Sequence, residues 1–331
     1  MSAQPVVVTG GAGFIGSHTC KLLRETGYQP ITVDNLRTGH ADAVKWGLFE
    51  KLDVRDTEGL VGLFEREQPV AVVHFAAAAY VGESVANPGL YYDNNVTGMT
   101  SLLAACARSG VSKVVFSSSC ATYGIPETLP ISEDTPQCPI NPYGRTKLIC
   151  EGMLSDFEIA HGIRSVALRY FNAAGADPSG ELSERHDPET HLIPLALMAA
   201  AGTRPPLQVF GTDYPTPDGT CIRDYIHVSD LAAAHVAALR HLQAGKSSAA
   251  FNVGTGQGHS ILEIAAAIKA VFGKDLPWNA AARRAGDPPT LVADTRRAAQ
   301  ELGFKATHSD LAQILRDAGP SFGLQAVDAV A

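Results

Sequence analysis

Short, continuously apolar segments alternate with longer amphipathic segments along the first half of the chain. The apolar segments are rich in Val, Ile and Phe, and they lie at residues 6–8, 31–33, 70–75, 114–116 and 166–168. Continuous apolar runs are typical of strands that are covered on both faces of a sheet. Residues 14–26 and 96–109, which lie between such runs, have the pattern of helices. This alternation predicts an α/β fold with a parallel sheet and right-handed crossovers.

Composition and charge exclude several classes of protein. The 331 residues suggest about two domains. A net charge of −8 without any basic run argues against nonspecific nucleic-acid binding. The six cysteines form no Cys-x-x-Cys pair, so no metal site is expected and the thiols indicate a reducing compartment. We find neither a signal peptide nor an apolar run of roughly 18 residues, so we expect a cytoplasmic protein with no membrane segment.

The first strand leads into a glycine-rich turn that opens a helix. Its glycines satisfy both Gly-x-Gly-x-x-Gly and Gly-x-x-Gly-x-x-Gly, patterns that let backbone approach a pyrophosphate at a helix N-terminus. An isolated match of this kind can also be only a tight strand–helix turn, but here a strand precedes it and a helix follows. The expected dinucleotide contacts in this turn are Gly10, Gly11, Gly13, Phe14, Ile15 and Gly16.

Further cofactor contacts are expected where the later strands end. Asp34 ends the second strand about 20 residues after the turn, where a carboxylate holds the ribose hydroxyls of NAD and repels the 2′-phosphate of NADP. Asn35 rather than a basic residue follows it, which favours NAD. The remaining candidates are Asp53 and Val54, which flank the adenine or form a surface strand end, and Phe75, Ala76 and Ala77, which approach the cofactor or begin an alanine-rich helix.

A tyrosine and a lysine share one face of a predicted helix. Asn141 is a suitable N-cap and Pro142 a suitable first residue, so Tyr143 and Lys147 lie at i and i+4. A nearby ammonium is expected to lower the tyrosine pKa and prepare it for proton exchange with a substrate hydroxyl. Such pairs are common on surfaces, but a strand ending in Ser117–Ser119 directs hydroxyls into the same cleft. We therefore predict Tyr143, Lys147 and Ser119 as catalytic residues.

Together these residues resemble the short-chain dehydrogenase/reductase superfamily, in its extended branch that modifies sugar nucleotides, and within it the UDP-glucose 4-epimerase family. The similar stretches cover nearly the whole chain. The most specific are Val-Gly-Glu-Ser at 81–84, Tyr-Tyr-Asp-Asn-Asn-Val at 91–96, and the segments 210–220 and 223–228. The resemblance implies an isomerase with tightly bound NAD, acting in galactose metabolism or in the supply of exopolysaccharide precursors.

The resemblance also implies a role for each residue of the site. Tyr143 takes the proton from the sugar 4-hydroxyl, Ser119 binds the same oxygen, and Lys147 holds the nicotinamide ribose, so that UDP-glucose and UDP-galactose interconvert through a transient 4-keto sugar. Asn95, Ser117 and Phe171 join the cofactor contacts. The implied substrate contacts are Asn172, Arg223 and Arg284 for the diphosphate sugar, Asp287 for the uridine ribose, Gln208, Val209 and Phe210 for the uracil, and His191 with Leu192, where the family commonly has Asn-Leu.

The implied architecture is a Rossmann-type, doubly wound parallel sheet over residues 1–171 and a smaller α/β substrate-binding domain over 172–331. Segments near 223–254 are expected to return to the first domain. Helices 96–109 and 143–160 are expected to form a homodimer interface, as in the superfamily.

Particular residues distinguish this function from the alternatives. A sugar-nucleotide dehydratase would need carboxylates in residues 119–123, where none occurs. A non-catalytic NAD-binding sensor would commonly lose Tyr143 and Lys147. A related 4-epimerase acting on UDP-N-acetylglucosamine remains open, since by the resemblance Leu291 is intermediate in size at the sugar end of the pocket. One acting on UDP-xylose or UDP-glucuronate also remains open, since it would use the same chemistry. Ala79 replaces a lysine that is frequent in the family near the cofactor phosphates.

Overall fold

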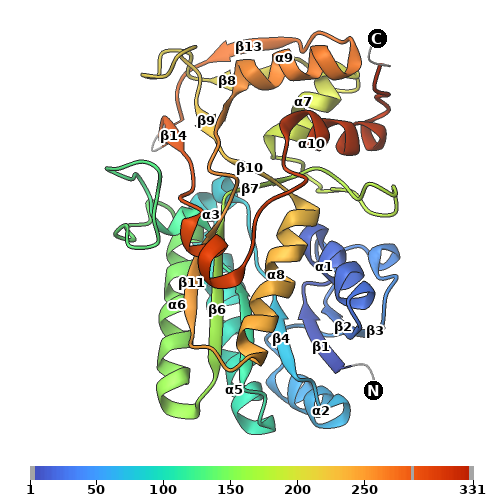
Figure 1. Cartoon of the computed structure of the whole chain (residues 1–331), viewed down its shortest axis with the longest axis vertical. Coiled ribbons are helices and arrows are strands. Elements are labelled where there is room, and N and C mark those ends of the chain that lie inside the picture. The colour runs from blue at the N-terminus through green and yellow to red at the C-terminus, as the bar shows by residue number, and fades with distance from the viewer. Residues whose placement is uncertain (1–3, 285–286, 328–331) are drawn as a thin grey trace.

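The computed structural model describes residues 4–284 and 287–327 and is built on one seven-stranded sheet (Figure 1). All strand pairs of this sheet are parallel, in the order β11-β6-β5-β4-β1-β2-β3. The predicted α/β class and the five predicted strands are therefore confirmed. The strands are β1 (Gln4–Thr9), β2 (Tyr28–Asp34), β3 (Leu48–Lys51), β4 (Ala71–His74), β5 (Lys113–Ser117), β6 (Arg164–Tyr170) and β11 (Ala249–Val253).

Helices cover both faces of the sheet because its strands are apolar on both sides. In β1, Val6 and Val8 pack into one core and Val7 into the other. The first core is closed by α1 (Phe14–Glu25) and α8 (Val228–Gln243), and the second by α2 (Thr57–Glu67), α5 (Gly98–Ser109) and α6 (Pro142–His161). This arrangement is the doubly wound architecture that the sequence predicts.

Two elements from the second half of the chain complete this layer. Strand β11 pairs with β6 at the edge of the sheet, and α8 packs beside α1 (Figure 1). The chain therefore crosses between its two lobes several times. A division of the sequence at residue 171 stays a prediction.

The remaining elements form a smaller lobe around a separate apolar core (Figure 1). Its small sheets pair β7 with β10, β8 with β13, and β9 with both β12 and β14. The bounds are β7 (Asn172–Ala174), β8 (Leu207–Phe210), β9 (Ile222–Arg223), β10 (Tyr225–His227), β12 (His259–Ser260), β13 (Trp278–Ala281), β14 (Thr290–Leu291), α7 (Leu192–Ala200), α9 (Ile261–Phe272), α10 (Leu311–Ala318) and η5 (Gly319–Phe322).

Short helices connect the two lobes and the strand ends. They are η1 (Ala41–Ala43), α3 (Val81–Ala86), α4 (Pro88–Tyr91), the π-helix η2 (Tyr92–Thr97), η3 (Cys120–Thr122) and the π-helix η4 (Ala298–Leu302). The predicted helix at 96–109 thus begins as a π-helical turn and becomes regular at Gly98. In the described part of the chain, we find no helix with the length and apolarity needed to cross a membrane.

Candidate active site

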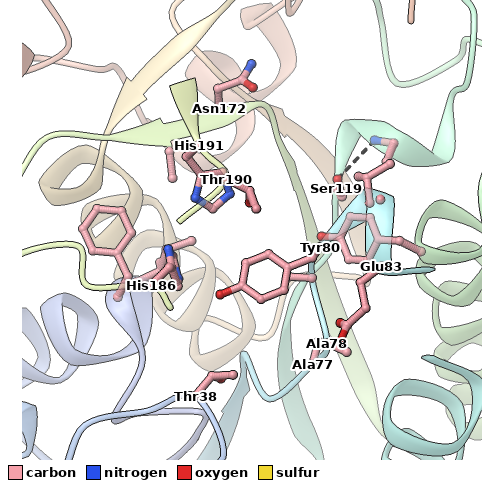
Figure 2. Close-up of a pocket in the computed structure, with 18 of the residues that line it drawn as sticks. Thr38, Ala77, Ala78, Tyr80, Glu83, Ser119, Asn172, His186, Thr190 and His191 are labelled. Atoms are coloured by element: carbon pink, nitrogen blue, oxygen red, sulfur yellow. Dashed lines mark hydrogen bonds between the residues drawn. The ribbon is translucent and has the colours of Figure 1, made fainter. Parts of the chain in front are cut away.

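A cleft of about 1400 Å³ opens where the strands of the large sheet end at their carboxyl side. Its walls come from the turns after β1, β2, β4, β5 and β6 on one side and from the smaller lobe on the other. Figure 2 shows Ser119, Asn172 and His191 around this one cavity, although they lie far apart in the sequence. Single small-molecule sites usually measure about 300–1,000 Å³. The cleft is therefore large enough for two ligands side by side.

The glycine-rich turn forms the end of the cleft nearest to α1. A Cβ atom on Gly16 would lie 2.2 Å from the Gly10 carbonyl oxygen, so only glycine permits this close packing of the helix on the turn. Gly13 is the N-cap of α1 and offers no side-chain bond, which leaves the N–H groups of the first turn available to an anion. Gly11 does not line the described cleft. A Cβ atom added at Gly11 would collide with Thr32, so the glycine allows the turn to pack closely against β2.

Asp34 occupies the position expected for a ribose-binding carboxylate. It is buried at the end of β2, lines the cleft, and accepts hydrogen bonds from the backbone N–H groups of Ala12 (3.1 Å) and Leu36 (2.8 Å). Burial raises its pKa, and the two backbone hydrogen bonds oppose that shift. A helix N-terminus beside an acid at the next strand end is the arrangement that holds a dinucleotide, so NAD fits this end of the cleft.

The other predicted cofactor residues fall into two groups. Those that line the cleft are Gly10, Gly13, Phe14, Ile15, Gly16, Asn35, Val54, Phe75, Ala76, Ala77, Ser117 and Phe171. Asp53 and Asn95 do not line it as the structure describes it. Asp53 instead pairs with Arg55 and accepts a hydrogen bond from Asn35 (2.9 Å). No helix begins before Val81 in this region, so the alternative of an alanine-rich helix at 75–79 is wrong.

Asn95 acts on the cleft indirectly. Its buried side chain accepts a hydrogen bond from the Ala78 N–H (2.8 Å) and donates one to the Ala78 carbonyl oxygen (3.0 Å). It also donates to the hydroxyl of Thr146 on α6 (3.1 Å). Asn95 therefore fixes the loop that follows β4 against the helix that carries Tyr143 and Lys147.

Tyr143 and Lys147 lie on the face of α6 that is turned to the cleft. The Asn141 side chain caps this helix by accepting from the Gly144 N–H (2.8 Å), as predicted. The Lys147 ammonium is buried, donates to the Ser117 carbonyl oxygen (2.6 Å), and lies 5.8 Å from the centre of the Tyr143 ring. Helix α6 and the end of β5 together therefore hold the predicted catalytic residues next to one another.

The pKa values of these two groups are dominated by burial. Burial lowers the pKa of Lys147 to about 8, because the charged ammonium loses water. Burial also raises the pKa of Tyr143 above its usual range, and a hydrogen bond from Ser119 opposes this without outweighing it. The expectation that the pKa of Tyr143 lies below its usual value is therefore wrong. The loss of hydration of the phenolate exceeds the help that it receives from Ser119.

A buried ionic network supports the same helix, and the sequence analysis did not identify it. Glu151, one turn after Lys147, accepts from Nη2 (2.6 Å) and Nε (3.0 Å) of Arg169 on β6. Glu151 also accepts from the Ser118 hydroxyl, and Arg169 donates to the Tyr123 hydroxyl (3.0 Å). The i+4 spacing from Lys147 was a usable signal for Glu151, but its partner on β6 could only be found from the fold.

The predicted substrate residues gather at the far end of the cleft. Those that line it are Ser119, Tyr143, Asn172, His191, Leu192, Gln208, Phe210, Arg223, Arg284 and Asp287, whereas the side chain of Val209 is buried in the core of the smaller lobe. Arg223 forms an ion pair with Asp287, and the Arg284 guanidinium lies 4.0 Å from the centre of the Phe210 ring. Asn172 donates to the Asp224 carbonyl oxygen (3.0 Å).

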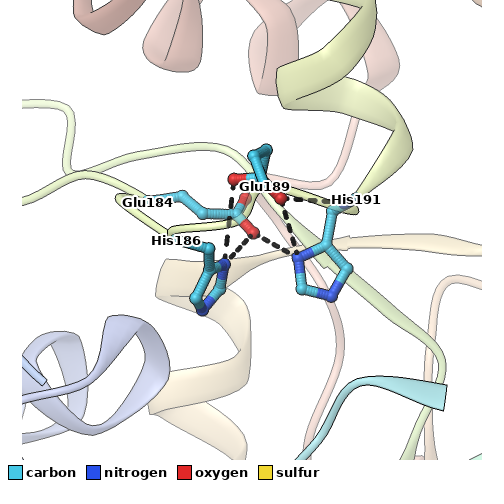
Figure 3. A group of neighbouring side chains, drawn as sticks. All are labelled: Glu184, His186, Glu189 and His191. Carbon is cyan, nitrogen blue, oxygen red and sulfur yellow. Dashed lines mark hydrogen bonds and ion pairs between the residues drawn. The ribbon is translucent and has the colours of Figure 1, made fainter. Parts of the chain in front are cut away.

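Two histidines and two glutamates form a cluster on the loop before α7 (Figure 3). The Nδ1 atom of His191 lies 2.6 Å from Glu184, and that of His186 lies 2.9 Å from the same carboxylate. Burial lowers the pKa of His191, but its bonds to Glu184 and Glu189 outweigh burial and raise it to about 10. Only His191 of this group was predicted. The spacing Glu-x-His-x-x-Glu-x-His was a visible signal for the others.

The chain is similar to known proteins over most of its length. Residues 6–254 match the model of the NAD dependent epimerase/dehydratase family. The UDP-glucose 4-epimerase of Rhizobium meliloti is 52% identical over 318 residues, which are 96% of this chain and 97% of that protein. The crystal structure of UDP-glucose 4-epimerase from Brucella ovis in complex with NAD is 59% identical, with a TM-score of 0.96 and coverage of 98% and 100%.

A second structure is that of UDP-glucose 4-epimerase from Bifidobacterium longum in complex with NAD+ and UDP. It is 39% identical, has a TM-score of 0.90, and the match covers 96% of this chain and 97% of that one. The sequence similarity extends over nearly the full length of both partners, and the folds agree over the same range. The chain belongs to the NAD dependent epimerase/dehydratase family.

Proposed function

We propose that this chain is an isomerase that interconverts UDP-glucose and UDP-galactose at C4, with NAD held in the cleft. The observation that carries the proposal is a single cleft that joins a dinucleotide-binding turn, a tyrosine–lysine pair and two arginines. Similarity to UDP-glucose 4-epimerases over nearly the whole chain supports the same activity. The activity is tested by incubating purified protein with UDP-galactose and measuring UDP-glucose without added NAD. Absence of turnover in protein that contains NAD would favour the non-catalytic sensor.

The end of the cleft nearest to α1 is the one that binds NAD in this proposal. The free N–H groups at the start of α1 receive the diphosphate, Asp34 receives the ribose hydroxyls, and Lys147 reaches the second ribose. NAD, when bound, supplies the chemistry of taking a hydride from C4 of the sugar and returning it. The protein supplies position, exclusion of water and the handling of the proton.

Tyr143 is the acid–base group of the proposed reaction. Its phenolate oxygen would accept the proton of the sugar 4-hydroxyl while the C4 hydride is taken up by bound NAD, which together leave a transient 4-keto sugar, and the phenol would give the proton back when the hydride returns after the sugar has turned. Burial raises the pKa of Tyr143, so its proposed role as a base depends on positive charge close to the phenolate oxygen. Lys147 lies close enough to favour the phenolate, and Ser119 can hydrogen-bond the same sugar oxygen.

Arg284 is proposed to hold the diphosphate of the substrate. Replacing it with Ala should raise KM for UDP-galactose by about 10- to 100-fold, since charge-assisted hydrogen bonds to phosphate contribute about 1.5–3 kcal/mol. The value of kcat should change little, because the contact exists before and during the reaction. Steady-state kinetics checks the split between KM and kcat.

The neighbouring arginine offers a matched control. Arg283 pairs with Asp213 and does not line the described cleft. Arg283→Ala should therefore leave KM close to that of the wild type. Equal KM values for the two variants would remove Arg284 from the diphosphate site.

The choice among UDP-sugars is also part of the proposal. Leu291 lines the cleft. UDP-glucose and UDP-galactose are proposed as the main substrates, and UDP-N-acetylglucosamine, UDP-xylose and UDP-glucuronate are the comparison substrates for the same assay.

We further propose that the protein acts as a cytoplasmic homodimer. All six cysteines are free thiols, in keeping with a reducing compartment. Helices α5 and α6 lie side by side, and α6 exposes Ile149 and Ile159, the latter 84% exposed. We expect light scattering to give the mass of two chains, and Ile159→Lys to shift the protein toward one chain. A wild-type monomer would contradict the dimer.

A further inference from the structure

The cluster of Glu184, His186, Glu189 and His191 has no step to perform in the proposed reaction. Its four potential ligand atoms all lie within 4.8 Å of one another. Figure 3 shows both imidazole rings presenting Nδ1 to the two carboxylates, with Nε2 directed away from the cluster. The loop that carries the cluster forms part of the cleft wall, where Glu184, His186 and His191 line it.

The distances within the cluster suit a single metal ion. Nδ1 of His186 lies 2.9 Å from Glu184 and 3.8 Å from Glu189, and Nδ1 of His191 lies 2.6 Å and 3.5 Å from the same carboxylates. In a tetrahedral site with bonds of about 2.0–2.1 Å, neighbouring ligand atoms lie roughly 3.3 Å apart. These four of the six separations bracket that value and the other two are within 4.8 Å, so small shifts of the side chains would centre all four residues on one ion.

The charges of the cluster also call for a cation. The side chains of Glu184 and Glu189 are each only 3% exposed. Among the described residues, neither carboxylate forms an ion pair with a lysine or an arginine. Burying carboxylates is costly unless positive charge accompanies them. One divalent ion would neutralise both carboxylates.

The surroundings already orient the ligands. Oε1 of Glu189 accepts from the backbone N–H groups of Thr190 (2.7 Å) and His191 (2.8 Å), which fixes that carboxylate. The Tyr80 hydroxyl oxygen is buried without a hydrogen-bond partner among the described residues, and Figure 2 shows it directed toward His186. The two rings have centroids 5.8 Å apart. Supporting bonds of this kind are typical around metal ligands, and the free hydroxyl can bond a water on the ion.

We propose that Glu184, His186, Glu189 and His191 bind one divalent transition-metal ion of the Zn²⁺ class. Two imidazoles and two carboxylates suit Zn²⁺ and its neighbours, whereas Mg²⁺ and Ca²⁺ prefer oxygen ligands alone. Coordination through Nδ1 leaves the proton of His191 on Nε2, where it can serve as a hydrogen-bond donor. The ion would thus fix the loop before α7 and set the donor state of His191.

The test uses untagged full-length protein that has been stripped with a chelator and then titrated calorimetrically with Zn²⁺. We expect one tight Zn²⁺ per chain, and a visible Co²⁺ spectrum of four-coordinate type when Co²⁺ replaces it. His186→Ala should weaken Zn²⁺ binding by at least about 100-fold, the upper end of the loss seen when only a supporting group is removed. His161→Ala, at an exposed histidine of α6, is the matched control and should bind Zn²⁺ like the wild type.

A second variant keeps the test decisive if His186→Ala loses its fold. Glu184→Gln preserves shape and removes one anionic ligand, so it should also lose the tight Zn²⁺ while keeping the circular dichroism of the wild type. Equal Zn²⁺ affinity in the wild type and in both cluster variants, or no tight Zn²⁺ in the wild type, would overturn the proposal. The cluster would then be a network of hydrogen bonds and ion pairs without a metal. Because epimerisation is assayed separately, its loss or retention does not bear on this outcome.

Discussion

Tyr143→Phe should lower kcat for UDP-galactose by about 10²–10⁴-fold, the usual contribution of a positioned acid–base group. The substitution removes one oxygen atom from a buried ring on α6 and leaves the apolar contacts of the ring in place. KM and the amount of bound NAD should change little, because the glycine-rich turn, Asp34 and the arginines are untouched. Single-turnover kinetics with UDP-galactose measures the chemical step directly.

Tyr92→Phe is the matched control for this prediction. Tyr92 belongs to the π-helix before α5 and does not line the described cleft. This variant should keep the wild-type kcat. Undiminished activity of Tyr143→Phe would show that another group moves the proton.

Arg169→Leu should reduce the free energy of unfolding by about 3–5 kcal/mol, since it leaves the Glu151 carboxylate buried without its cation. The side chains of Arg169 and Glu151 are 8% and 10% exposed, so water cannot replace the lost partner. The change also removes the donor to Tyr123 and loosens α6 against β6. Urea unfolding followed by circular dichroism gives the difference in stability, and the amount of retained NAD reports on the site.

The double variant Arg169→Leu/Glu151→Leu separates the ion pair from simple loss of packing. It removes both charges, so it should be less destabilised than the sum of the two single variants. Strict additivity would contradict the buried pair as the cause.

The sequence predicts the large layer well because its strands are covered on both faces. Val6, Val7 and Val8 must all be apolar to fill two cores, and such a run is easy to recognise. The smaller lobe is harder to predict. Several of its strands have only two or three residues, as in β9 and β14, and they are defined by partners distant in the sequence rather than by their own pattern.

Local spacing predicts which residues stand near each other but not their surroundings. The i and i+4 spacing correctly places Tyr143 and Lys147 on one face of α6, yet the direction of the tyrosine pKa depends on burial that no spacing reveals. In the same way, Gly11 and Asn95 belong to the right segments, but Gly11 packs against Thr32, Asn95 bonds to Ala78, and neither lines the described cleft. Substrate roles for the cleft residues remain proposals.

We propose that one cleft removes hydrogen from C4 of the sugar and returns it to the same molecule. The decisive experiment incubates UDP-galactose carrying deuterium at C4 with the purified protein, without added NAD. We expect UDP-glucose that keeps the deuterium at C4 over many turnovers per chain. Loss of the label to solvent, or a single turnover that leaves keto sugar and reduced cofactor, would contradict it.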